Sequence, residues 1–231
     1  MKLTSIIALF AMSFSLCAAA PVDDAASSSA GFVRKLQAGE KQTVVYYGTS
    51  LTAAGAWTRL LTNRLKETFP GQVTAHNSGG PGSHSGWGID NLQQRVIALK
   101  PDVVFIEFAI NDAVARFNLG PERAKANLEK MVDRIQTALP GCEIILQIMN
   151  PVIDKPQGDS GWRPRMAVYQ QNYREVAQER GLLLIDHMPA WTRLLEQGEP
   201  MFRGYVPDGV HPAEDGWREI VMPGLLRRLG L

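Results

Sequence analysis

Three polar residues of this chain have the types and spacing that nucleophilic catalysis by a serine requires. Ser50 follows an apolar run that ends at Gly48, and His211 stands three residues after Asp208. A serine hydroxyl is a poor nucleophile without an adjacent base, and histidine suits that role because its pKa lies near neutral pH. A carboxylate that accepts the other ring N–H would hold the histidine in the correct tautomer. These residues therefore indicate attack by Ser50, with His211 as base and Asp208 as its partner.

Each of these residues also has an ordinary structural explanation. A serine in a strand-to-helix turn is more often a cap or a turn former. Asp208 and His211 could be a capping residue and a surface histidine at a helix entry. A metal site is a further alternative, but no H-E-x-x-H sequence and no cysteine cluster accompanies His211. The catalytic interpretation therefore depends on where the fold places these residues.

Two further polar segments follow apolar runs. The glycines at 77–83 would let backbone N–H groups approach a ligand closely, and the absence of a Gly-Lys-Ser/Thr element excludes a phosphate loop. In 107–112, Asn111 could donate its side-chain N–H to an oxyanion. A plain flexible loop and an Asn-Asp turn are the alternative explanations.

The alternation of short apolar runs with amphipathic stretches predicts the frame that positions these groups. Ligands of parallel α/β sheets bind at the carboxyl ends of the strands, so the polar segments should meet there. The predicted fold class is α/β, a three-layer α/β/α sandwich with a parallel, flavodoxin-like five-stranded sheet. We expect strands at 43–47, 72–76, 103–108, 143–149 and 182–185, with helices between them and a last helix from about Pro212.

Four short blocks together resemble the SGNH (GDSL-type) hydrolase family, in order and over nearly the whole chain after residue 30. The family's first block, Gly-Asp-Ser-Leu, is similar to Gly48-Thr49-Ser50-Leu51-Thr52, and its second block is similar to Asn77-Ser78-Gly79. The third block, Gly-x-Asn-Asp, is similar to Ala109-Ile110-Asn111-Asp112, and the last, Asp-x-x-His, matches Asp208-Gly209-Val210-His211.

The resemblance implies a role for each matched position. Ser50 would be the nucleophile, His211 the base and then the acid, and Asp208 the residue that orients His211. The backbone N–H groups of Ser50 and Gly79 and the side chain of Asn111 would form the oxyanion hole. No metal or organic cofactor would be required.

Two positions depart from the family pattern, since Thr49 replaces Asp and Ala109 replaces Gly. Neither position performs the chemical step in the family. Thr49 could change how the nucleophile turn is braced, and the methyl group of Ala109 could narrow the pocket beside Asn111. Activity is therefore still expected.

The expected activity is hydrolysis of a carboxylic ester through an acyl-enzyme, with a carbohydrate acetylesterase as the more specific hypothesis. Trp87, Trp162 and Trp217 could stack on sugar rings, although tryptophans that pack the core or brace loops are at least as common. A lipid acylhydrolase, a thioesterase, an aryl esterase and an acetyltransferase with the same triad are alternatives. An inactive carbohydrate-binding protein is the alternative from another class, and the intact triad argues against it.

The chain has 231 residues with 45% hydrophobic and 20% charged side chains, an ordinary globular composition. The formal net charge of +1 creates no general field that attracts nucleic acid or an anionic membrane. Expected partners are small-molecule or glycan esters, without nucleic acid and without stable membrane insertion.

The first residues resemble a secretory signal. Lys2 precedes a short apolar region at 6–12 and small residues that end at Ala20. We therefore expect a signal peptide at 1–20, a flexible segment at 21–30 and one hydrolase domain at 31–231, exported to the periplasm or secreted. Cys17 raises a lipoprotein alternative, which the bulky Leu16 before it does not favour. Removal of the signal would leave Cys142 without an internal disulfide partner.

Overall fold

The structure, a computed structural model, describes residues 29–153 and 155–231. The expected signal peptide and all but the last two residues of the expected segment at 21–30 lie outside these ranges. Five parallel strands form one sheet in the order β2-β1-β3-β4-β5, which confirms the predicted flavodoxin-like sheet. The strands are β1 (Gln42–Gly48), β2 (Val73–Asn77), β3 (Val103–Glu107), β4 (Glu143–Ile148) and β5 (Leu183–Asp186).

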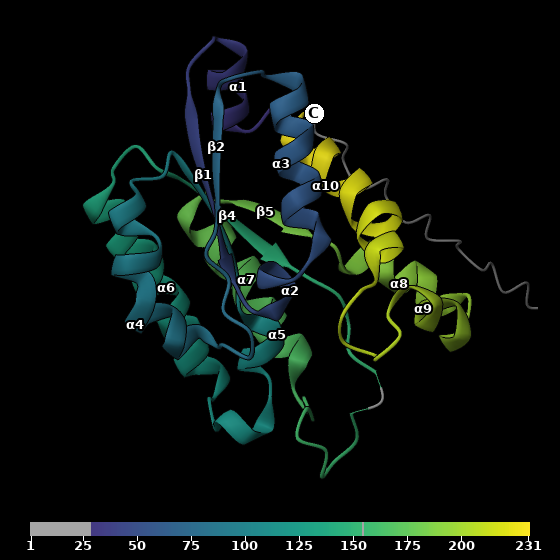
Figure 1. The fold of residues 1–231 in the computed structure, drawn as a ribbon. Helices are drawn as coiled ribbons and strands as arrows, with labels where there is room; N and C mark the ends of the chain where they lie inside the picture. Colours follow the sequence, from purple (N-terminus) through teal and green to yellow (C-terminus); the bar gives the residue numbers. More distant parts are fainter. Residues whose placement is uncertain (1–28, 154) are drawn as a thin grey trace, which may run out of the picture.

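Alternate side chains of the central strands enter two separate hydrophobic cores. In β1, Val44 and Tyr46 belong to one core, and Val45 and Tyr47 belong to the other. Figure 1 shows helices on both sides of the sheet, which confirms the three layers. The first core contains residues of α1 (Gly31–Gln37), α3 (Ala56–Thr68), α8 (Met188–Glu196), α9 (Glu199–Tyr205) and α10 (Met222–Leu229), and the second those of α4 (Ser85–Arg95), α6 (Pro121–Ala138) and α7 (Met166–Arg180).

The segment after β5 differs most from the expectation. Two short helices, α8 and α9, precede the turn at 208–211, and each carries a proline in its first turn. The last helix begins after Pro212, not at it, and passes through a π-helical stretch, η3 (Gly216–Val221), before α10. Such short helices give little periodic signal, because two turns expose only two or three apolar positions.

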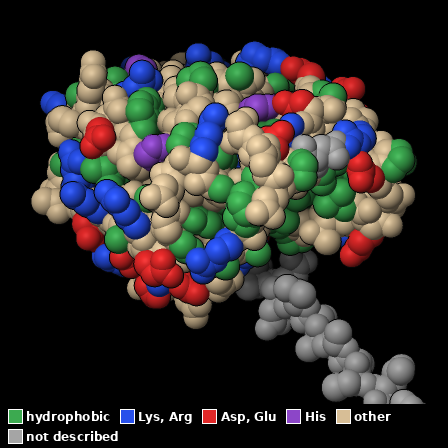
Figure 2. Space-filling model, turned by 90° about the horizontal axis from the view of Figure 1, so that it is seen from below, with side chains coloured by type: hydrophobic (Ala, Val, Ile, Leu, Met, Phe, Trp, Pro, Cys, Tyr) green, Lys and Arg blue, Asp and Glu red, His purple; other side chains and the backbone are tan. Residues whose placement is uncertain are grey.

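The polar segments leave the sheet at its carboxyl edge. Ser50 begins the short helix α2 (Ser50–Ala53) directly beyond β1, and Asn111 lies in α5 (Ala109–Asp112) beyond β3. The 3₁₀ turns η1 (Ile97–Leu99) and η2 (Ala115–Phe117) complete the described elements. Figure 2 views the molecule from this edge, where charged side chains lie among hydrophobic ones. Among the described helices, none has the length and apolar character needed to span a membrane.

Candidate active site

The turn that carries Ser50 begins where β1 ends. Thr49 adopts extended backbone angles, and its hydroxyl accepts a hydrogen bond from the Leu51 N–H at 3.2 Å. Thr49 thereby caps the N-terminus of α2. As the first residue of this helix, Ser50 has a backbone N–H without an intrahelical acceptor. Both the hydroxyl and the backbone N–H of Ser50 are therefore placed at the carboxyl edge of the sheet.

A buried carboxylate braces this turn. Glu107, which lies beside Gly48 in the sheet register, accepts hydrogen bonds from the Thr49 N–H at 2.7 Å, the Thr49 hydroxyl at 3.0 Å and the Thr52 hydroxyl at 2.6 Å. Burial raises the pKa of Glu107 to about 7, and the hydrogen bonds from Thr52 and Thr49 oppose that rise. Glu107 of the neighbouring strand thus supplies a carboxylate that holds this turn, although residue 49 is Thr and not the Asp of the family pattern.

Ser50, His211 and Asp208 form one hydrogen-bonded chain. The Ser50 Oγ lies 2.9 Å from His211 Nε2, and His211 Nδ1 lies 2.7 Å from Asp208 Oδ2. A hydroxyl bonded to an imidazole, whose far nitrogen faces a carboxylate, is the geometry of a nucleophile, its base and an orienting group. The structure therefore brings together the three residues that the sequence singled out.

The Asp208 turn supports His211 through its own backbone. Asp208 Oδ1 accepts the N–H of His211 at 2.6 Å and that of Val210 at 2.9 Å. Partial burial raises the pKa of Asp208, but hydrogen bonds from His211 and Val210 outweigh this effect and hold the pKa below its usual value. Gly209 has a φ of +74°, and a Cβ there would lie 2.5 Å from the Ile153 carbonyl oxygen. Only glycine fits this turn without strain.

The amide of Asn111 is held on two sides. Its Nδ2 donates to the Ser83 carbonyl at 2.9 Å, and its Oδ1 accepts from Arg163 Nη2 at 3.2 Å. Arg163 also donates to the Ile110 carbonyl through Nε at 2.7 Å and to the Gly161 carbonyl through Nη1 at 2.6 Å. These contacts fix which end of the amide is nitrogen, and they leave one N–H of Asn111 available.

The structure corrects the expectation for Gly79. The Gly79 N–H donates to Asn77 Oδ1 at 3.1 Å, and a Cβ on Gly79 would lie 2.5 Å from the backbone nitrogen of Ala53. Gly79 therefore packs against α2 and does not line the cleft that contains Ser50, Asn111 and His211. Gly82 lines it instead, with a φ of +69°, and no acceptor for its N–H is found among the described residues.

The match to a known family covers the sheet and the catalytic segments. The model of the GDSL-like lipase/acylhydrolase family matches residues 42–218. The chain belongs to this family. The resemblance stated from the four sequence blocks is thereby confirmed, and the protein is a serine ester hydrolase. No curated protein matches the chain.

Solved structures share the fold of this GDSL-like hydrolase. LAE5, an α/β hydrolase enzyme from the metagenome of Lake Arreo in Spain, is 26% identical, with a TM-score of 0.69 over 83% of this chain and 96% of that one. Axe2, an acetylxylan esterase from Geobacillus stearothermophilus, is 22% identical, with a TM-score of 0.70 over 83% of this chain and 95% of that one.

The three tryptophans that sequence analysis offered for substrate binding do not line the cleft. Trp217 is buried in the first core. Trp87 packs against the rings of Tyr47 and Phe108 in the second core. Trp162 stands between two cleft residues in the chain, and its backbone carbonyl accepts a hydrogen bond from the Ala115 N–H at 2.9 Å. Stacking of a sugar on Trp87 or Trp217 is therefore not supported, while a role for Trp162 stays a prediction.

The cleft of the GDSL-like hydrolase has a volume of about 380 Å³ and a mostly polar lining. Among the described residues that line it, only Val114 and Val210 have apolar side chains. Ala109, whose methyl group could have narrowed the pocket, packs in the second core instead. Within residues 29–153 and 155–231, no group of three or more His, Cys, Asp or Glu side chains is arranged to hold a metal ion.

Proposed function

We propose that this esterase removes acetyl groups from the hydroxyls of a polar alcohol, most specifically a carbohydrate. The observation that carries the proposal is the chain from Ser50 Oγ through His211 to Asp208 at the edge of a small, polar cleft. An acetyl group needs little apolar surface, and Val114 and Val210 supply little. A long-chain lipid would need an extended apolar groove, which this lining does not offer.

In the proposed first step, Ser50 Oγ attacks the acyl carbon while His211 Nε2 takes its proton. Negative charge then develops on the carbonyl oxygen. The backbone N–H groups of Ser50 and Gly82 and the Asn111 amide would donate to that oxygen, and loss of one such donor typically costs ~10²–10³-fold in rate. His211 next returns the proton to the leaving alcohol, and the acyl group remains on Ser50.

In the second step, water replaces the alcohol. His211 takes a proton from the water, which attacks the acyl carbon and displaces Ser50 Oγ. The proton then returns to Ser50, and the carboxylic acid leaves. Asp208 stabilises the positive charge that His211 carries in both steps.

Similarity to solved enzymes supports the carbohydrate part of this proposal. Axe2 is named as an acetylxylan esterase, and this chain shares its fold over 83% of its length. We also propose export, on the strength of the charged start, apolar region and small residues at 1–20.

Hydrolysis of p-nitrophenyl acetate by the wild type and by Ser50→Ala tests the proposed chemistry. We expect turnover in the wild type and loss of turnover in the variant. Absence of activity in folded wild type, or full activity in Ser50→Ala, would overturn it and favour an inactive binding protein.

Two further assays test the substrate. In a chain-length series of p-nitrophenyl esters, we expect rates to fall beyond the shortest acyl groups, and a preference for C8 or longer esters would instead favour a lipid acylhydrolase. Acetate release from a panel of acetylated glycans, with Ser50→Ala as control, then identifies the alcohol. Transfer of the acetyl group to an added sugar would reveal an acetyltransferase.

A further inference from the structure

The cleft carries positive charge that the proposed mechanism does not use. Arg116, Lys155 and Arg163 line it, and among the described lining residues the only carboxylate is that of Asp159. These three cations come from two different segments, η2 and the irregular loop between β4 and α7. The excess is local, because the whole chain has a formal net charge of only +1.

Some cations elsewhere on the described surface are paired with carboxylates. Arg59 pairs with Glu214 at 2.6 Å, and Lys125 lies 2.9 Å from Glu175. In the part of the chain that the structure describes, neither Arg116 nor Lys155 has a carboxylate within ion-pair distance. The Arg116 guanidinium lies over the Phe117 ring, 5.0 Å from its centroid. Within residues 29–153 and 155–231, two cations without a carboxylate partner therefore stand at the cleft that contains Ser50.

Arg116 and Arg163 are close enough to repel each other. Burial and, secondly, the charge of Arg116 lower the pKa of Arg163 to about 10, while Asp159 and Asp208 oppose the change. Arg163 still remains charged at neutral pH, and three of its N–H groups are used by protein acceptors. Two neighbouring guanidiniums repel each other, Asp159 and Asp208 offset part of this repulsion, and a bound carboxylate would relieve more of it.

We infer that the alcohol part of the substrate carries a carboxylate near the acetylated hydroxyl. Arg116 and Lys155 bind this carboxylate, since their charged groups have no carboxylate partner among the described residues. Arg163 attracts the carboxylate through its positive charge without binding it directly. A guanidinium presents paired N–H donors that match a carboxylate. For an acetylated glycan, this means a uronic acid at or beside the acetylated sugar. The inference rests on the proposed deacetylation and specifies its substrate class.

A matched pair of substrates tests this inference. Monoacetylated methyl glucuronoside and monoacetylated methyl glucoside, acetylated at the same position, differ only in a carboxylate or hydroxymethyl group at C6. We expect kcat/KM to be about tenfold higher for the glucuronoside in the wild type, since an exposed ion pair contributes roughly two- to fivefold and two cations are involved. The preference should shrink as salt is added, because salt screens exposed charges.

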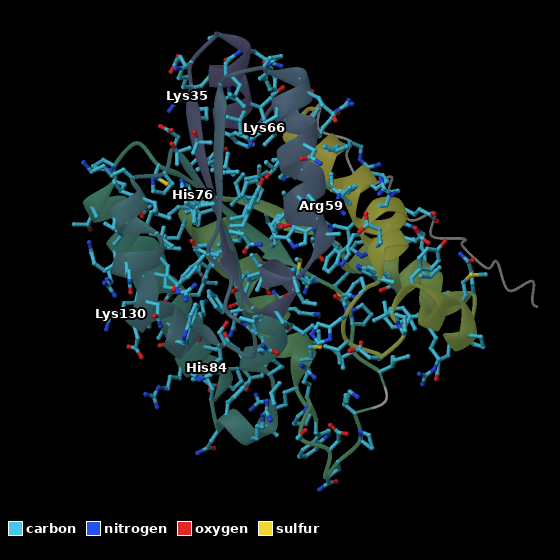
Figure 3. The ribbon with its side chains drawn as sticks, viewed as in Figure 1. Lys35, Arg59, Lys66, His76, His84 and Lys130 are labelled. Atoms are coloured by element: carbon cyan, nitrogen blue, oxygen red, sulfur yellow. The ribbon has the colours of Figure 1, made fainter. Side chains whose placement is uncertain are left out.

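Arg116→Gln and Lys155→Gln should each lower the preference, and the double variant should bring it close to one. Lys66→Gln is the matched control, since Lys66 lies on α3 toward the opposite end of the molecule from His84, which precedes α4 near the catalytic edge (Figure 3). The control should keep the full preference. Rates on neutral p-nitrophenyl acetate should change less than about twofold in all these variants.

The outcomes separate this inference from the proposed function. Equal kcat/KM for the two sugars, or a preference that survives the double variant, would overturn the inference and leave the deacetylase proposal intact. Hydrolysis of p-nitrophenyl acetate with no hydrolysis of either sugar would also overturn the inference. No hydrolysis of any of the three esters would overturn the proposed function, and the inference would fall with it.

Discussion

The two halves of the catalytic site are supported in different ways. Ser50 stands on a turn whose neighbours Thr49, Thr52 and Glu107 are buried and hydrogen-bonded to one another. The side chains of His211 and Asp208 are 47% and 54% exposed, and Asp208 is held by the backbone of its own turn. The position of the nucleophile is thus set by the core, while that of the base is set by a local turn.

The two carboxylates show the same contrast. Burial raises the pKa of Glu107 to about 7, whereas hydrogen bonds outweigh partial burial at Asp208 and lower its pKa. Glu107 holds the buried nucleophile turn through its hydrogen bonds to Thr49 and Thr52, whereas Asp208 stays ionised beside His211. Substitutions of the exposed His211 and Asp208 should change activity without changing stability. Substitutions around the buried Glu107 should change both activity and stability.

The largest effect is expected for His211→Ala, which removes the base from the exposed side. We predict a decrease in kcat/KM of ~10⁴-fold or more on p-nitrophenyl acetate, because Ser50 loses its proton acceptor. The free energy of unfolding in urea should stay within about 0.5 kcal/mol of the wild type, since surface changes rarely do more. A variant that keeps a tenth of the activity would contradict the assignment of the base.

Asp208→Asn should have the next largest effect, roughly 10³–10⁴-fold on kcat, because an amide favours the wrong tautomer of His211. Asp215→Asn is the matched control, an exposed aspartate of the same region with no part in the chain of hydrogen bonds. If both variants lose activity equally, the effect is not specific to the partner of His211.

Arg163→Lys tests whether the orientation of Asn111 matters separately from charge. We predict a decrease in kcat of about 10–100-fold, less than the ~10²–10³-fold expected for Asn111→Ala, because the lysine keeps the charge but not the fork that holds the amide. KM for p-nitrophenyl acetate should change little. In an Asn111→Ala background the Arg163→Lys effect should largely disappear. Additive losses would instead indicate that Arg163 acts independently of Asn111.

The smallest effect on activity is expected for Glu107→Gln, less than about tenfold in kcat, while the pH dependence of stability should change. With a pKa of about 7 in the folded state and ~4.3 in the unfolded state, the folded protein binds more protons between these values. The contribution of Glu107 therefore lowers stability as pH rises through this window.

Relative to the wild type, Glu107→Gln should gain about 2 kcal/mol in unfolding free energy between pH 5 and pH 7. Urea denaturation at several pH values measures this difference. Asp112, whose pKa burial also raises to about 7, is present in both proteins, and its charge contributes to the raised pKa of Glu107. Glu175→Gln on the surface provides a control that should show no such gain. A constant difference between wild type and Glu107→Gln would contradict the raised pKa.

Sequence patterns were sufficient for the parallel sheet and its layers, and the resemblance of the four blocks implied the meeting of Ser50 with His211. Strands that are buried on both faces leave long apolar runs, and parallel strands bring their carboxyl ends to one edge. Residues that directly follow such strands can therefore be placed without knowing any side-chain contact.

The residues that sequence analysis missed depend on packing or on loop geometry. Several glycines of 77–83 could supply an N–H, and only the folded turn selects Gly82 over Gly79. Arg163 lies in an irregular loop without periodicity, so its contact with Asn111 had no sequence signal. Glu107 did have a sequence signal, because an acidic residue near the end of the apolar run at 103–108 must find hydrogen-bond donors when it is buried.

The tryptophans show the same limit. Trp217 stands close to His211 in the chain, yet its ring is buried in the first core. The direction of a side chain depends on which face of its helix packs against the sheet, and sequence proximity to a catalytic residue does not reveal this.

Covalent labelling of Ser50 tests the central claim most directly. The folded protein is treated with a fluorophosphonate, whose phosphorus is attacked by an activated serine with loss of fluoride, and the adduct is located by peptide mass spectrometry. The triad predicts one adduct, on Ser50, which disappears in Ser50→Ala and forms far more slowly in His211→Ala. An adduct on another residue, or equally fast labelling of the two variants and the wild type, would contradict the account.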